Sequence, residues 1–180
     1  RQFFHRHDTR SYSVARRLFE RACAIDPQFA RAIAAIADCD AFLYLHSVTG
    51  ASPSVIMATS KRALALQPDL PEAHASRGLA LYVDGRFAEA EQEFETALGL
   101  DPHLFEAWYF YGRAKFVEGD MAKAATLFER AAEMQPDDFQ SHCLLQNIYR
   151  SLDRPADSLA AATEGVRRAR RELERHPDNA

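Results

Sequence analysis

The sequence has little cysteine and no excess of positive charge. Its 180 residues include three cysteines, Cys23, Cys39 and Cys143, which are widely spaced and form no CxxC pair. This spacing disfavours a disulfide framework or a zinc site, so we expect reduced, mostly buried thiols and neither metal nor cofactor. The formal net charge is -4. A chain without an excess of positive charge has no long-range attraction for nucleic acid, so nucleic-acid binding is disfavoured.

Long apolar runs and the common catalytic motifs are also missing. No run approaches the roughly 20 apolar residues of a membrane helix, and no signal peptide opens the chain, which predicts a cytoplasmic protein with no membrane partner. The motifs GxGxxG, GxxxxGKS/T, HExxH and GxSxG do not occur, and the seven histidines are scattered. We therefore predict that the chain is not an enzyme and has no catalytic residues.

What the sequence does contain is an internal repeat of 34 residues. Pro68, Pro102 and Pro136 follow one another at this offset. The same offset links Gly78 to Gly112, Gly85 to Gly119, Ala90 to Ala124, Phe94 to Phe128 and Ala97 to Ala131. Because so many pairs share one offset, the chain is built from repeated structural units.

Each unit is predicted to contain two helices. Pro71, which follows Asp69, is suited to the first turn of a helix, and Gly85 can adopt the positive backbone angle that ends one. Apolar residues recur at helical spacing on both sides of Gly85. The expected fold is all-α and made of helical hairpins.

These residues resemble the signature of the tetratricopeptide repeat (TPR) family, W-x2-L-G-x2-Y followed by A-x3-F, Ala and Pro. The best match runs from Phe105 to Pro136 and contains Trp108, Tyr111, Gly112, Ala124, Phe128 and Ala131. The resemblance covers nearly the whole chain. It implies a TPR helical-hairpin solenoid with a right-handed superhelix.

The matching positions divide residues 1–180 into a single array. The predicted units are a partial repeat at 1–27, a lengthened repeat at 28–69, repeats at 70–103 and 104–137, and a last repeat at 138–180. The lengthened repeat has seven additional residues, which are predicted near Tyr44 to Ser52, between its helices. The last repeat is expected to end in a long helix from about Pro155 to His176.

A narrower resemblance concerns the parent protein. The segments Phe19-Glu20-Arg21-Ala22, Ser52-Pro53-Ser54 and Pro71-Glu72-Ala73-His74 look like TPR regions attached to bacterial nucleotide cyclases and winged-helix regulators. That resemblance implies a bacterial signalling protein. Because the chain begins at Arg1 and ends shortly after His176-Pro177-Asp178, we expect it to be part of a longer polypeptide.

Two histidines stand where the TPR family usually has a large core aromatic residue. His74 and His142 are interpreted as half-buried side chains, each satisfied by a neighbour. Metal binding is disfavoured because the two residues lie two repeats apart, too far to share an ion.

In TPR proteins, ligands bind the concave surface formed by the first helices of the repeats. First-helix positions that the core pattern does not use include Arg31, Asp38, Glu72 and Glu106. The predicted ligand-binding residues of the concave groove are Tyr82, Tyr109, Phe110, Arg113, Phe116, Asn147 and Arg150. Two alternatives stay open for the aromatic cluster, since these rings either form the groove or pack between adjacent helices.

The leading functional prediction is a protein-protein interaction module that binds a peptide or protein segment in this groove. The alternative is a structural spacer or dimerisation element without a peptide ligand. The alternative depends on the last helix, whose apolar stripe predicts a homodimer and consists of Leu159, Ala162, Val166, Ala169 and Leu173. Basic residues of that helix, among them Arg167 and Arg168, are expected to face solvent.

Overall fold

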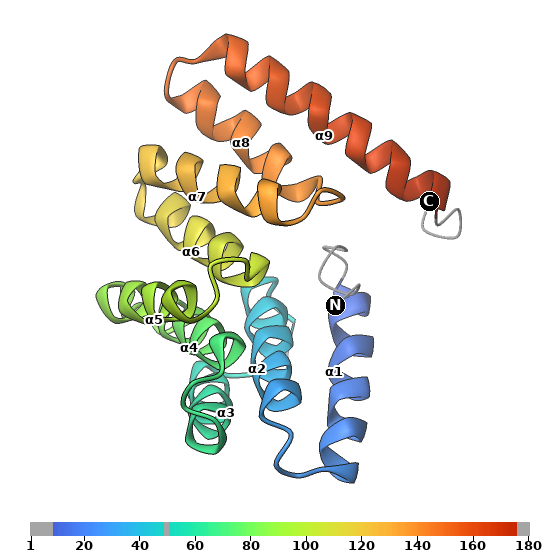
Figure 1. Ribbon diagram of the computed structural model, residues 1–180, viewed down its shortest axis with the longest axis vertical. Coiled ribbons are helices and arrows are strands. Elements are labelled where there is room, and N and C mark those ends of the chain that lie inside the picture. The colour runs from blue at the N-terminus through green and yellow to red at the C-terminus, as the bar shows by residue number, and fades with distance from the viewer. Residues whose placement is uncertain (1–8, 49–50, 176–180) are drawn as a thin grey trace. The chain divides into compact units, whose positions relative to one another are not determined.

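The computed structural model describes residues 9–48 and 51–175, which form helices joined by short connections (Figure 1). The helices are α1 (Thr9–Ile25), α2 (Ala30–Leu45), α3 (Pro53–Leu66), α4 (Pro71–Val83), α5 (Phe87–Leu100), α6 (Phe105–Glu118), α7 (Met121–Met134), α8 (Gln140–Ser151) and α9 (Pro155–Arg175). No strand occurs within these ranges, so the predicted all-α fold is confirmed. The chain divides into two compact units, residues 1–110 and 111–180.

In the first unit, consecutive helices pack against each other as hairpins. Helix α1 contacts α2, α2 contacts α3, and α4 contacts α5. Helix α2 also contacts α4, so the first helices of successive repeats lie side by side. In the second unit, α8 contacts both α7 and α9. This nearest-neighbour packing is that of a solenoid of helical hairpins.

Prolines and short polar side chains start several of these helices. Pro53 and Pro71 occupy the first turns of α3 and α4, where the missing proline N–H removes no helical hydrogen bond. The hydroxyl of Ser52 accepts a hydrogen bond from the backbone N–H of Val55 at 3.4 Å. The predicted helix start at Pro71 is therefore confirmed.

Residues with positive φ end the first helix of each complete repeat. Gly85 (φ 78°) follows α4 and Gly119 (φ 86°) follows α6. Asp153, 34 residues after Gly119, has φ 54°, and Ser47 after α2 has φ 58°. Aspartate tolerates this left-handed conformation better than most side chains do. The same left-handed turn is thus present in the two repeats that have no glycine at this position.

Gly78 and Gly112 allow the two helices of a hairpin to approach closely. A Cβ atom on Gly78 would lie 2.6 Å from Cε1 of Phe94, and one on Gly112 would lie 3.1 Å from Cε1 of Phe128. Both phenylalanines are fully buried. The 34-residue offset of these glycines therefore reflects the same packing contact in two repeats.

The two irregular repeats keep the same helical pattern. Helix α2 ends at Leu45 and α3 begins at Pro53, and residues 49–50 of the segment predicted to hold the additional residues lie outside the described residues. Helix α9 runs from Pro155 to Arg175, and the predicted end at His176 lies outside the described residues. Each predicted unit from 28 to 180 contains one pair of consecutive helices, α2 with α3 through α8 with α9. A single uninterrupted array over 1–180 stays a prediction. None of the helices in the described ranges has the length and apolar character needed to span a membrane.

Candidate functional site

The predicted groove residues are divided between the two units. Tyr82, Tyr109 and Phe110 belong to the first unit, and their side chains are buried. The ring of Phe110 meets that of Phe42 edge-on, with 5.6 Å between centroids, and Tyr109 stacks on Phe105 at 5.4 Å. For these three aromatics the geometry favours the packing alternative.

The other four predicted residues belong to the second unit and reach its surface. Arg113 and Phe116 on α6 are partly exposed, and Asn147 and Arg150 on α8 are exposed. Arg150 donates a hydrogen bond from Nη2 to Oδ1 of Asn147 at 3.0 Å. Nδ2 of Asn147 donates to the carbonyl oxygen of Cys143 at 3.1 Å, which holds the side chain along the helix. Ligand binding by these four residues stays a prediction.

At one repeat position, a side-chain ring nitrogen forms a hydrogen bond with the backbone carbonyl oxygen of the proline that closes the preceding repeat. Nε2 of His74 lies 2.7 Å from the carbonyl oxygen of Pro68, and Nε1 of Trp108 donates to that of Pro102 at 2.8 Å. Nδ1 of His74 also lies 2.7 Å from the carboxylate of Glu93. The interpretation of His74 as a half-buried histidine satisfied by its neighbours is confirmed.

His142 occupies the same position one repeat after Trp108 and is half-buried as interpreted, but the expectation of a neighbour that satisfies it is wrong for Nε2. This nitrogen is buried, and none of the described residues forms a hydrogen bond with it. Arg168 of α9 instead reaches the end of α7, where its Nη1 donates to the carbonyl oxygens of Ala132, Gln135 and Asp138 at 3.1, 3.2 and 3.2 Å. Burial and the nearby Arg168 lower the pKa of His142. The expectation that Arg168 faces solvent is therefore also wrong.

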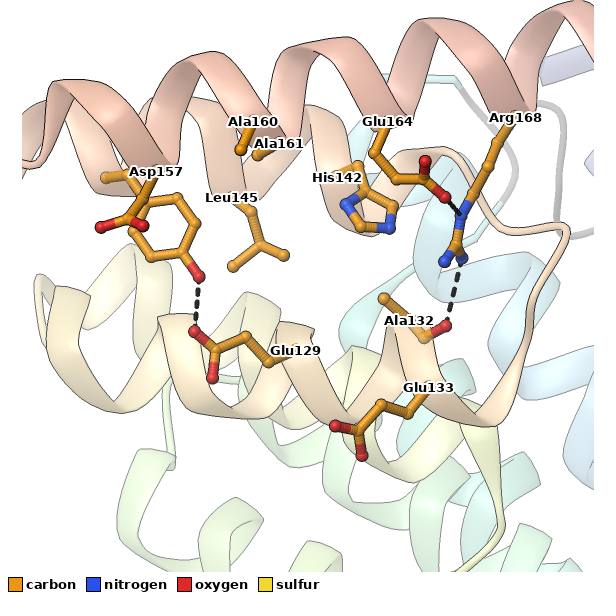
Figure 2. Close-up of a pocket in the computed structure, with 11 residues that line it drawn as sticks. Glu129, Ala132, Glu133, His142, Leu145, Asp157, Ala160, Ala161, Glu164 and Arg168 are labelled. Carbon is orange, nitrogen blue, oxygen red and sulfur yellow. Dashed lines mark hydrogen bonds and ion pairs between the residues drawn. The ribbon is translucent and has the colours of Figure 1, made fainter.

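These residues line a cavity of about 420 Å³ between α7, α8 and α9 (Figure 2). Four of its lining residues are acidic, but each of them already has a partner. The pairs are Glu129 with Tyr149, Glu133 with Arg130, Asp157 with Arg154, and Glu164 with Arg167 and Arg168. Hydrogen bonds from Arg167 and Arg168 lower the pKa of Glu164 to about 2. Desolvation and the bond to Glu129 raise the pKa of Tyr149. Because these acids are engaged, the cavity offers a ligand little unsatisfied charge.

A second cavity, of about 210 Å³, lies in the first unit and has a different chemistry. Its apolar lining comes from Phe19, Phe29, Ala32, Ala35 and Ala75, and its charged lining from Arg31, Asp38, Glu72 and Glu106. Four first-helix positions predicted for the concave surface thus line one cavity, whereas none of the seven predicted ligand-binding residues lines it. A helical pattern gives no indication of cavity volume, so this cavity could not be predicted from the sequence. In the described part of the chain, no group of three His, Cys, Asp or Glu side chains is arranged to hold a metal ion.

The repeats match a known family. Residues 61–105 and 77–139 match the sequence profile described as the tetratricopeptide repeat. Residues 61–139 are therefore tetratricopeptide repeats. Proteins of this family are generally scaffolds for protein binding rather than enzymes. No curated protein has significant sequence similarity to this chain.

Solved TPR structures share the fold over most of the chain. TTC0263, a thermophilic TPR protein of Thermus thermophilus, has a TM-score of 0.71 and 21% identity, with 91% of this chain and 86% of that chain covered. MamA has a TM-score of 0.65 and 14% identity, with 91% and 92% covered. Human IFIT1 has a TM-score of 0.66 and 19% identity, with 94% of this chain but 39% of that chain covered. At these identities the similarity shows the fold alone.

The three thiols of the chain differ in exposure. Cys39 is fully buried in α2, Cys23 is partly buried, and Cys143 is exposed on α8. The expectation of mostly buried thiols is therefore wrong for Cys143, which lies on the surface side of its helix. Burial raises the pKa of Cys39 and, with help from Asp138, that of Cys143.

We expect iodoacetamide to alkylate Cys143 of the native protein well before Cys39. The thiolate is the reactive form, and an enclosed thiol with a raised pKa reacts only after the surrounding helices open. Peptide mass spectrometry after a timed pulse measures both rates, and a pulse in denaturant provides the reference. Equal protection of the two cysteines would contradict the exposure found for Cys143.

Proposed function

We propose that this chain is a protein-interaction module whose first helices bind a peptide or protein segment in a concave groove. TPR repeats support protein binding in general, and the exposed Arg150–Asn147 pair on α8 is the observation that supports a ligand surface in the second unit. Arginine supplies directional donors for carboxylates and backbone carbonyls, and partly exposed aromatics such as Phe116 supply contact area. Tyr82, Tyr109 and Phe110 then belong to the buried packing of the first unit.

We further propose that the module belongs to a larger regulatory protein of the bacterial cytoplasm. The resemblance of its segments to TPR regions of nucleotide-cyclase and winged-helix regulators supports this assignment. The three cysteines are free thiols, the form that a reducing compartment maintains.

The charge reversal Arg150→Glu should weaken a partner identified by pull-down by at least about 1 kcal/mol, because it replaces a donor of the ligand surface with a repelling carboxylate. Isothermal titration calorimetry measures the change, and circular dichroism checks that the helices are retained. Phe110→Ala is a poor test, since truncating this buried ring costs roughly 3–5 kcal/mol of stability.

The matched control is Arg130→Glu on the exposed face of α7, where Arg130 pairs only locally with Glu133 at 2.8 Å. This variant should leave affinity nearly unchanged. If Arg130→Glu abolishes binding while Arg150→Glu does not, the ligand binds another face and the proposed surface is incorrect.

The exposed side chains of α9 favour a second candidate function, self-association. Leu159, Val166 and Leu173 are 70%, 54% and 43% exposed, and they follow one another at seven-residue intervals. Large apolar side chains repeated along one helix stripe form a seam that a second helix can cover. A homodimer through α9 would make the chain a dimerisation element.

Leu173→Glu should convert concentration-dependent dimers into monomers, since a carboxylate in an apolar seam loses its hydration without gaining a partner. Sedimentation velocity over a range of protein concentrations measures the association. Arg171→Glu, an exposed position of the same turn outside the stripe, should still dimerise. A strict monomer of the unchanged protein at high concentration would rule out this candidate.

A further inference from the structure

The cavity of the first unit combines apolar walls with an acidic side. Its volume of about 210 Å³ is far above the roughly 10–15 Å³ that one water molecule needs. Phe19 of α1 and Phe29, which precedes α2, form the apolar wall together with three alanines. Phe29 is 43% exposed, so this wall is open to solvent at one end.

The acidic side comes from one repeat position. Asp38 on α2, Glu72 on α4 and Glu106 on α6 are separated by 34 residues each. Because α2 packs beside α4, equivalent positions of consecutive first helices come together, and all three carboxylates line the same cavity. The repeat therefore concentrates negative charge at one place in the fold.

Among the residues that the structure describes, one of the three carboxylates has a cationic partner. Glu72 forms an ion pair with Arg31 at 2.8 Å, and the side chain of Arg31 is itself 59% exposed. Glu106 makes no ion pair with any described residue, although it faces the cavity. The cavity lining therefore carries more acid than base.

Asp38 is the buried member of the group, and one of its two carboxylate oxygens has a hydrogen-bond partner among the described residues. It is 7% exposed, and its Oδ1 accepts a hydrogen bond from the hydroxyl of Ser76 at 2.5 Å. Within residues 9–48 and 51–175, the second carboxylate oxygen accepts no hydrogen bond. Burial, together with the negative charges of Glu106 and Glu72, raises the pKa of Asp38. A buried carboxylate in this state is costly, and an incoming cation would offset that cost.

We propose that this cavity receives an arginine side chain of a bound polypeptide. The alkyl stem would pack against Phe19 and Phe29, and the guanidinium would donate to Asp38 and Glu106. A guanidinium suits the site because it is weakly hydrated, stacks on aromatic rings and offers several donors in one plane. This inference rests on the proposed function of polypeptide binding and adds the chemistry of one contact.

The test uses the full chain and N-acetyl-arginine methylamide as the probe. The matched probe is N-acetyl-citrulline methylamide, which has nearly the same shape and no charge. In ¹H–¹⁵N correlation spectra, the arginine probe should shift the amides of Ala32, Ala35 and Ala75 saturably. The citrulline probe should bind at least about tenfold more weakly, because it lacks the charge that complements the carboxylates.

Two variants connect this binding to the acidic side of the cavity. The side chain of Glu106 is partly exposed, so the Glu106→Gln variant should fold normally. This variant should bind the arginine probe at least about fivefold more weakly. Asp38→Asn should weaken it as well. Glu95→Gln, an exposed carboxylate change on α5, should leave the affinity unchanged.

The proposal is overturned if the two probes bind equally, if the shifts do not map to the cavity, or if Glu106→Gln has no effect. Failure of the proposed function gives a different result. A protein that binds the arginine probe but captures no polypeptide supports the cavity and argues against the interaction module. A protein that captures a polypeptide without binding the probe retains the module and refutes the arginine site.

Discussion

Gly78→Leu is expected to lower the free energy of unfolding by about 3 kcal/mol, the upper end of the usual cost of overpacking a core. A Cβ at this position would lie 2.6, 2.7 and 2.9 Å from three ring atoms of Phe94. The Phe94 ring is fully buried, so it cannot move without displacing its own neighbours. Urea denaturation followed by the helical signal measures the loss.

Gly99→Leu in α5 is the matched control, since a Cβ there meets no atom within 4 Å. The change from glycine to leucine should stabilise this helix by roughly 0.5–1 kcal/mol through helix propensity alone. Gly112→Leu, with contacts of 3.1 Å to Phe128, should fall between the two. Similar losses for Gly78→Leu and Gly99→Leu would contradict the close helix contact.

Asp138→Ala is expected to lower the free energy of unfolding by about 2–4 kcal/mol, because two buried N–H groups lose their acceptors at once. The Asp138 side chain is fully buried just before α8. Its Oδ1 accepts from the N–H of Gln140 and its Oδ2 from the N–H of Ser141, both at 3.0 Å. Thermal and urea unfolding of the variant measure the loss.

Asp120→Ala separates burial from helix capping. Asp120 is exposed and caps α7 by accepting from the N–H of Lys123 at 3.1 Å. Water can replace this carboxylate, so the change should cost only about 0.5–1 kcal/mol. If the two alanine variants lose the same free energy of unfolding, the buried hydrogen bonds of Asp138 stabilise the protein no more than an ordinary helix cap does.

Sequence reasoning predicted the features that depend on neighbouring residues in the chain. Pro71 starts α4, Gly85 ends it, and the offset between Gly78 and Gly112 marks a contact inside each hairpin. Each of these is set by backbone geometry within one repeat. The 34-residue spacing was therefore sufficient to predict the fold.

The site could be predicted only in part, because it depends on contacts between repeats. A groove and a helix interface both require aromatics at first-helix positions, so the pattern alone did not show that Phe110 is buried against Phe42. Arg168 bonds carbonyls 30 or more residues earlier, which no local pattern indicates. Asp138 was missed although a signal existed, since an aspartate just before a helix is a common cap.

The long final helix has a consequence for local opening of the protein. Among the 21 residues of α9, only Ala161 and Gly165 are buried, whereas α4 buries eight of its 13. Backbone amides open with free energies that follow local burial, so hydrogen exchange reaches α9 before α4. Arg168 ties the middle of α9 to carbonyls at the end of α7. We therefore expect fraying of the turns that follow Arg168 to leave these carbonyls bonded, whereas opening that includes Arg168 breaks its hydrogen bonds to the end of α7.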